Sequence, residues 1–227
     1  MRGSNLTLPS PVWKERNLKM TQYGPESGID PLEIEKLDLE RYGLGHLNGV
    51  NLLDISEEDM DKLLKALGDE DISLNIPIPC TPFNVNEVLT YGTCRRCGRC
   101  CIPNPLNPGN PGVEAFESEL RAIAQHTRIT FEELQAKTLR GKVVAHPFEP
   151  TKLSFTRWLP LPCPYHNENT GCRIYPVRPI VCVIHPVVFT EDNTRITIKA
   201  NCEYGKELIK AALQEVKKKD PSTVIPL

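Results

Sequence analysis

No run of this sequence approaches the roughly 18 apolar residues that a membrane-spanning helix needs. The longest apolar stretch, residues 180–189, is interrupted by His185 and Pro186. The first twenty residues carry five charges and no apolar stretch of the kind a signal peptide contains. We therefore expect a cytoplasmic protein that does not bind to a membrane.

Fingerprints of nucleotide-binding and protease chemistry are also missing. The sequence has no G-x-G-x-x-G turn, no Walker loop and no H-E-x-x-H pair, and no paired acid and base stand out. The formal net charge of −2 gives no general attraction to nucleic acid. We expect no nucleic-acid partner, and whether the chain is an enzyme stays open.

Cysteine is absent before residue 80 and abundant after it. The nine cysteines are Cys80, Cys94, Cys97, Cys100, Cys101, Cys163, Cys172, Cys182 and Cys202. Structural disulfides are rare in the reducing cytosol, so a dense set of cysteines there indicates a metal site. A disulfide framework is the alternative, but it needs an export route that the sequence does not show.

The expected fold class is α+β. Capping signals and apolar periodicity predict helices over residues 30–42, 56–67, 113–126, 130–140 and 203–219. Alternating β-branched and aromatic residues predict strands over 153–158 and 195–199, with short extended pieces at 172–175 and 181–189. Because proline is frequent, at 21 residues, we expect a small, loop-rich cysteine domain with short strands and a few helices, stabilised by metal.

Two parts of the chain differ in composition. Residues 1–75 are acidic and cysteine-free, and they predict a helical N-terminal appendage. This appendage either covers the same core or docks on a partner protein. Residues 76–227 hold every cysteine and predict a metal- or cluster-binding domain that a C-terminal helix closes.

The strongest signal is the run Cys94-Arg95-Arg96-Cys97-Gly98-Arg99-Cys100-Cys101. The C-x2-C-x2-C spacing lets one loop wrap a single centre with three thiolates, as in bacterial ferredoxins, and Gly98 suits the sharp turn that wrapping requires. Adjacent side chains diverge at Cβ, so we expect one of Cys100 and Cys101 to face a second centre or to be a reserve thiol.

The second half adds Cys163, Cys172, Cys182 and Cys202 at wide intervals. With Cys80 set aside, eight thiols suffice for two four-coordinate sites, or for one site with spare thiols. Structural zinc favours separated C-x2-C pairs. The single compact run favours an iron–sulfur cluster instead, [4Fe–4S] in type, with zinc as the alternative.

Several nearby residues have open roles. Arg95, Arg96 and Arg99 either offset the charge of a thiolate cluster or are solvated loop residues. Second-half cysteines lie close in sequence to His166 and His185, which we expect in turn packing or second-shell hydrogen bonds rather than as ligands. We expect Cys80 to be an ordinary small residue.

These motifs together resemble a known family. The Cys94–Cys101 run, the Cys163-Pro164 step, the block Cys172-Arg173-Ile174-Tyr175-Pro176-Val177-Arg178-Pro179, Cys182 and His185-Pro186 resemble the zinc- or iron-chelating CxxCxxCC domain family, often labelled iron–sulfur-cluster-containing proteins. The resemblance covers about residues 90–205. It departs from the typical pattern where Val183 follows Cys182 and where His185 precedes Pro186. Flagellin lysine N-methylases contain a similar domain, but that similarity reaches only the cysteine motifs.

The resemblance implies a set of ligands and no agreed reaction. The implied ligands are Cys94, Cys97, Cys100, Cys101, Cys163, Cys172, Cys182 and Cys202. From the residues, Arg178 on its rigid Arg-Pro turn is expected to pair with a cluster or a carboxylate, and Tyr175 is expected to pack with its hydroxyl satisfied.

Three functions compete on these observations. The first is an iron–sulfur protein that transfers electrons or helps assemble or modify a partner protein. The second is a structural zinc-binding interaction subunit. The third and weakest is a protein-modifying enzyme related to lysine N-methylases. The first two predict a protein partner or a larger complex.

Overall fold

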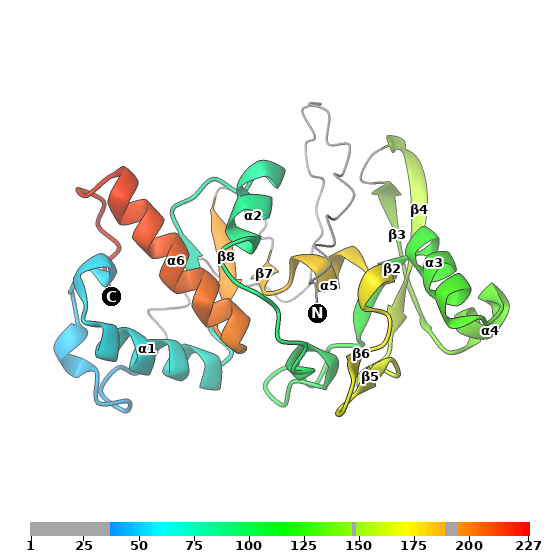
Figure 1. Cartoon of the computed structure of the whole chain (residues 1–227), viewed down its shortest axis with the longest axis horizontal. Helices are drawn as coiled ribbons and strands as arrows, with labels where there is room; N and C mark the ends of the chain where they lie inside the picture. The colour runs from blue at the N-terminus through cyan, green and yellow to red at the C-terminus, as the bar shows by residue number, and fades with distance from the viewer. Residues whose placement is uncertain (1–36, 147–148, 189–194) are drawn as a thin grey trace, which may run out of the picture.

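The structure is a computed structural model that describes residues 37–146, 149–188 and 195–227. It confirms the α+β class, because helices alternate with short antiparallel strands (Figure 1). The α-helices are α1 (Glu57–Asp69), α2 (Pro82–Leu89), α3 (Glu117–Thr127), α4 (Phe131–Ala136), α5 (Ile180–Ile184) and α6 (Glu203–Lys219). Four 3-10 turns of the described residues are η2 (Gly45–Leu47), η3 (Leu52–Asp54), η4 (Arg99–Cys101) and η5 (Tyr175–Val177).

The strands pair into three small antiparallel sheets. The strands are β1 (Ser73–Ile76), β2 (Val113–Phe116), β3 (Leu139–His146), β4 (Glu149–Leu159), β5 (His166–Asn167), β6 (Gly171–Cys172), β7 (Val187–Val188) and β8 (Ile196–Lys199). Their orders are β1-β8-β7, β2-β4-β3 and β5-β6. No helix in the described part of the chain is long and apolar enough to cross a bilayer.

The first core joins both ends of the described chain. Leu63 and Leu67 of α1 pack with Leu208 and Ile209 of α6, and the buried residues of β1 and β8 complete the cluster. Residues on both sides of position 75 therefore share one core, while the predicted division of roles between 1–75 and 76–227 stays a prediction.

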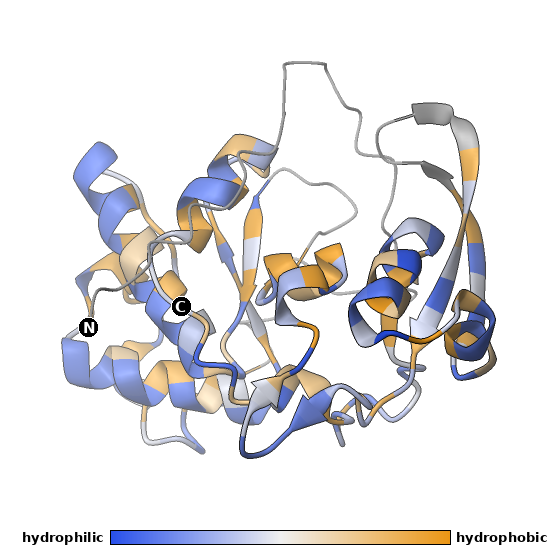
Figure 2. Ribbon diagram, turned by 45° about the vertical axis from the view of Figure 1, so that its right-hand side comes forward, coloured by the Kyte–Doolittle hydropathy of each residue, from blue (hydrophilic) through white to orange (hydrophobic). Residues whose placement is uncertain are grey.

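The second core lies between the sheet β2-β4-β3 and the helices α3 and α4. Its buried side chains include Leu120 and Ile123 of α3, Leu134 of α4 and Leu159 of β4. The short, almost entirely apolar helix α5 lies between the two cores in the view of Figure 2. The cysteine-bearing loops run along the same junction, so the site lies where the two cores meet.

The predicted capping signals form as expected. Ser56 Oγ accepts a hydrogen bond of 3.1 Å from the Asp59 N–H and starts α1. At α4, Thr130 Oγ1 accepts from the Glu133 N–H at 3.1 Å, and Glu133 Oε2 accepts from the Thr130 N–H at 2.8 Å. Each bond satisfies an amide that the first helical turn leaves without a backbone partner.

Five predicted elements differ from the structure. Of the extended piece expected at 172–175, only Cys172 lies in a strand, β6, and the chain then turns into η5. Residues 113–116 form β2 rather than the start of a helix, because they pair with 156–159 of β4, and α3 begins at Glu117. The helix predicted over 130–140 ends at Ala136, since the chain from Leu139 pairs with β4 as β3. Of the extended piece expected at 181–189, residues 181–184 lie in α5 and residues 187–188 form β7, while residue 189 lies outside the described residues. Of the helix predicted over 30–42, residues 37–42 form turns, and the rest lies outside the described residues.

The remaining predictions for strands and the last helix are confirmed. Strands β4 and β8 cover the two predicted alternating stretches, and α6 has the predicted bounds. The basic residues of its last turn, Lys217, Lys218 and Lys219, lie at the end where the helix dipole favours cations.

The close approach of α6 to the end of β8 generates a test of the first core. A Cβ built on Gly205 would lie 2.0 Å from the Lys199 carbonyl oxygen, which is backbone and cannot move aside alone. We expect Gly205→Ala to lower the free energy of unfolding by about 2 kcal/mol through overpacking, as measured by urea denaturation.

The matched control is Gly109→Ala, since no heavy atom lies within 4 Å of a Cβ at Gly109. We expect it to leave the urea midpoint almost unchanged. Equal midpoints for both variants would contradict the packing of α6 described above.

Candidate metal centre

The cysteine run folds as a tight loop around Gly98. This glycine has φ +78°, in the left-handed region, and the Cys101 N–H donates to its carbonyl oxygen at 2.8 Å. A Cβ at this position would lie 1.9 Å from His166 Nε2. The sharp turn predicted for Gly98 is therefore confirmed, and it is also the place where the loop closes over His166.

A backbone hydrogen bond joins the two cysteine stretches. The Cys163 N–H donates to the Cys101 carbonyl oxygen at 2.7 Å. The chain then turns, with the His166 N–H donating to the Cys163 carbonyl at 3.1 Å, and enters the β5–β6 hairpin, where His166 pairs with Cys172. Two stretches about sixty residues apart in sequence thus meet at their cysteines.

The sulfurs of the adjacent cysteines do not diverge as the sequence predicts. Cys100 Sγ and Cys101 Sγ lie 4.0 Å apart. The two thiols share an S–H···S contact in which either sulfur can be the donor. The side-chain contacts of Cys101 with Cys100 and Cys163 raise the pKa of Cys101 and lower the pKa values of Cys100 and Cys163. The backbone N–H groups of Tyr165 and His166 lower the pKa of Cys163 further. Cys100 and Cys163 are therefore the thiols most ready to become thiolates.

The other five predicted ligands surround this trio on two sides. Cys172 and Cys182 are partly buried, and burial raises their thiol pKa, as do the charges of Cys100 and Cys163 nearby. On the other side, burial raises the pKa of Cys202 to about 11, and its electrostatic neighbours are Cys97, Cys100 and Cys94. Cys100 is common to both groups, so it lies at the middle of the set.

The arginines of the cysteine run have specific partners rather than solvent alone. Arg95 pairs with Glu207 of α6, and an Arg99 nitrogen donates to the Asn201 carbonyl oxygen at 3.1 Å. The Arg96 guanidinium lies 4.0 Å from the centre of the Tyr175 ring. Each of the three arginines thus joins the cysteine run to a segment that contains a predicted ligand or lies next to one in sequence.

Tyr175 holds a second cation at the site. The Arg178 guanidinium also lies 4.0 Å from the centre of its ring, a cation–π contact like that of Arg96. The charge of Arg178 lowers the thiol pKa of Cys100 and opposes the rise at Cys182. The expectation that Arg178 acts on the cysteine site thus has an electrostatic basis, with Tyr175 as its support.

Residues with open roles lie around the thiols. His185 is partly buried, and burial, with the charge of Lys199, lowers its pKa to about 4, so the imidazole is neutral at pH 7. His166 packs against Gly98. Cys80 is buried in the first core, where a small apolar residue fits.

Two positioning carboxylates were not found from the sequence. Glu119 accepts the Ile180 N–H at 2.7 Å and the Phe116 N–H at 2.8 Å, which fixes the start of α5 against α3. Asp71 accepts from Asn104, Lys199 and Asn201 and so ties the loop after the cysteine run to the end of β8. The only sequence signal for Glu119 was its place in the first turn of a helix, and Asp71 had none.

The cysteine thiols are donors that suit a thiophilic metal. Their side chains do not have the mutual placement of ligands around one metal ion. None of the nine cysteines, all of which are described, forms a disulfide. Among the described residues, no three His, Cys, Asp or Glu side chains have the mutual placement of a metal site. Free thiols on two abutting loops, with Cys100 and Cys163 made acidic, fit a zinc or iron centre.

The comparisons with known proteins agree with this chemistry. The comparison with curated proteins gave no match, and the comparison with solved structures gave none either. Residues 93–203 match the family model CxxCxxCC, described as "Putative zinc- or iron-chelating domain", which supports metal binding by this chain. Residues 93–203 are thus similar to the CxxCxxCC family of zinc- or iron-chelating domains, and the matched range includes the whole cysteine run.

Proposed function

We propose that this chain is an iron–sulfur protein that transfers electrons to a partner protein or helps to assemble or modify one. The observation that carries the proposal is the junction of Cys101 and Cys163. Their backbones are hydrogen bonded at 2.7 Å, and the Cys101 thiol is shared between Cys100 and Cys163. This junction brings thiols from both halves of the motif beside one another, as a common centre requires.

The protein surrounds the proposed ligands with positive charge and shields them in part from water. The proposed ligands are the eight cysteines other than Cys80, and when a cluster is bound it supplies one-electron redox chemistry. Arg178 and Arg96, both held by Tyr175, offset negative charge on the thiolates. The neutral imidazole of His185 adds no charge beside them.

A structural zinc site is the second candidate, and one observation favours it. Cys94 and Cys202 pack with the first core, whereas Cys163 and Cys172 pack with the second. A closed four-coordinate zinc held by thiols of both cores would fix their relative position, which is the role of structural zinc. In that case the chain would be an interaction subunit rather than a redox protein.

Metal and sulfide analysis after purification without oxygen separates these candidates. We expect a coloured protein with iron and acid-labile sulfide, and a paramagnetic resonance signal in the reduced form, because the compact C-x2-C-x2-C run suits a cluster. A colourless protein that holds stoichiometric zinc and no sulfide would replace the first candidate with the second.

Metal removal should loosen the junction before it unfolds the cores. With chelator, we expect hydrogen exchange of the Cys163 and Cys101 amides to accelerate at least about tenfold, since their bonds join loops that the metal holds closed. Exchange-detected mass spectrometry measures this effect. The backbone amides of α1, whose apolar side chains are buried in the first core, are the internal control and should stay protected from exchange.

Removal of the Arg178 charge should weaken metal binding. The Arg178→Gln variant loses a cation that favours thiolates at Cys100 and Cys182, so their pKa rises and fewer thiolates are available at pH 7. We expect about a tenfold loss of affinity, measured by competition with a coloured chelator, and a smaller deficit at higher pH.

Arg41→Gln is the matched control, because Arg41 also lies over a tyrosine ring, 5.4 Å from the centre of Tyr42, which packs against the first core. It should bind metal like the unmodified chain. If the Arg178→Gln variant kept the same affinity for metal at every pH, Arg178 would have no role in metal binding.

A further inference from the structure

The backbone holds Cys101 and Cys163 within the separation that a disulfide can span. The Cys163 N–H donates to the Cys101 carbonyl oxygen at 2.7 Å. With standard bond lengths, this hydrogen bond keeps the two Cα atoms within about 6.6 Å of each other. Disulfides join Cα atoms that are about 4.4 to 6.8 Å apart. The two thiols are also in contact, so their side chains point toward each other.

The neighbouring pair Cys100 and Cys101 is less suited to a bridge, although its sulfurs lie 4.0 Å apart. The peptide that joins these two residues is trans, and a trans peptide sets consecutive Cα atoms about 3.8 Å apart. That separation is shorter than the range of ordinary disulfides. A bridge between the two cysteine stretches is therefore favoured over a bridge within the cysteine run.

A small oxidant can reach the pair. Cys101 and Cys163 are both partly exposed, whereas Cys80 and Cys202 are buried. Partial exposure is one of the features that distinguish an oxidisable thiol from an inert structural one. Neither Cys101 nor Cys163 lies in an α-helix or a strand, so their sulfurs can move from contact to bonding distance without breaking a regular array of hydrogen bonds.

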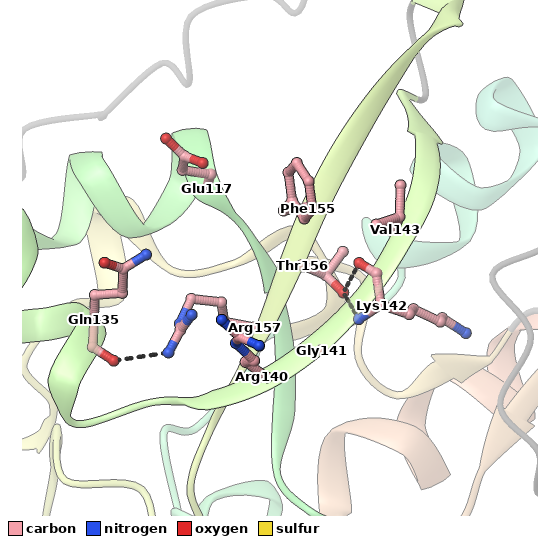
Figure 3. Close-up of a pocket in the computed structure, with 9 residues that line it drawn as sticks. All are labelled: Glu117, Gln135, Arg140, Gly141, Lys142, Val143, Phe155, Thr156 and Arg157. Carbon is pink, nitrogen blue, oxygen red and sulfur yellow. Dashed lines mark hydrogen bonds between the residues drawn. The ribbon is translucent and has the colours of Figure 1, made fainter.

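A cavity of about 470 Å³ on the sheet β2-β4-β3 lacks this kind of chemistry (Figure 3). No cysteine or histidine lines it. Its Arg157 donates to the Gln135 carbonyl oxygen at 3.0 Å and so has a partner within the fold. Phe155 of β4, which lines it, is exposed, as is Leu153 on the same face of the strand. The nucleophilic thiols lie instead at the cysteine junction.

We propose that Cys101 and Cys163 are a reversible oxidation site, at which hydrogen peroxide forms a disulfide in the metal-free chain and thereby prevents metal binding until the disulfide is reduced. A thiolate of the pair attacks a peroxide oxygen, the O–O bond breaks, and a sulfenic acid forms. The other thiol then attacks that sulfur, the S–O bond breaks, and the oxygen leaves as water. Two thiols and one peroxide molecule thus give one disulfide and two water molecules.

The disulfide and the metal compete for the same sulfurs. The inference rests on the proposed function, since Cys101 and Cys163 are both among its proposed ligands. A thiolate is the form of cysteine that binds a metal, so the disulfide removes one proposed ligand from each half of the motif. A bound metal occupies these sulfurs in turn and protects them from peroxide. The site therefore takes up metal only while the pair is reduced.

Peptide mapping of the full chain tests the site. The reduced, metal-free chain is treated with equimolar hydrogen peroxide, its free thiols are blocked, and it is digested with trypsin, which cuts after lysine and arginine. The proposed disulfide joins peptide 100–121 to peptide 158–173. We expect this joined pair, lighter by two hydrogen atoms than its two parts, as the main product that a reductant separates. A bridge inside either peptide, or no bridge, would overturn the proposal.

Four single variants assign the bridge, because each of the two peptides contains a second cysteine. Cys101→Ser and Cys163→Ser should each lower the yield of the joined peptides at least about tenfold. Cys100→Ser and Cys172→Ser, which alter the other cysteine of the same peptides, are the matched controls and should leave the yield unchanged. Joined peptides that persist without Cys101 or without Cys163 would overturn the assignment.

Zinc uptake by the same samples tests the competition. The oxidised chain should take up at least about tenfold less zinc than the reduced chain, and treatment with a phosphine reductant should restore the uptake. A chain loaded with zinc before peroxide is added should form the disulfide at least about tenfold more slowly. Equal uptake before and after oxidation, or equal rates with and without zinc, would overturn the proposal.

Iron and acid-labile sulfide, measured on chain purified without oxygen, keep this inference apart from the proposed function. A chain that holds iron and sulfide but forms no disulfide with peroxide after metal removal would reject the oxidation site alone. A disulfide that blocks zinc uptake in a chain that never holds iron or sulfide would reject the iron–sulfur proposal and leave the oxidation site standing.

Discussion

The hydrogen bond from the Cys163 N–H to the Cys101 carbonyl oxygen is the contact on which the site depends. It joins the two cysteine stretches at 2.7 Å, and these stretches come from regions that otherwise belong to separate cores. Neither core needs the other to bury its own leucines and isoleucines. The junction between them is built from loops, hydrogen bonds and thiols, and a metal held by those thiols would add to its rigidity.

Electrostatics explains why this junction suits a metal. Thiols that are partly buried resist ionisation, as the raised pKa of Cys182 and Cys202 shows. Two features oppose that cost at Cys100, namely its S–H···S contact with Cys101 and the cation of Arg178. A bound metal would replace the shared proton as the positive partner of the sulfurs. The thiol network without metal is therefore the protonated counterpart of the proposed ligated state.

Sequence reasoning succeeded where the controlling interactions are local. The caps at Ser56 and Thr130 and the bounds of α6 depend on residues within one or two turns, and the Gly98 turn depends on one φ angle. It failed where a distant segment decides. Residues 113–116 become a strand because β4 lies beside them, about forty residues later in the chain, and no local pattern encodes that neighbour.

The same distinction applies to the site itself. Spacing predicted that the cysteines belong together, but it carried no information on the partners of the loop arginines, because Glu207 and Tyr175 reach them only through the tertiary fold. The exposed face of β4 follows the same logic. Alternation predicted a half-buried strand at 153–158, yet only the lengths of α3 and α4 determine where its cover ends.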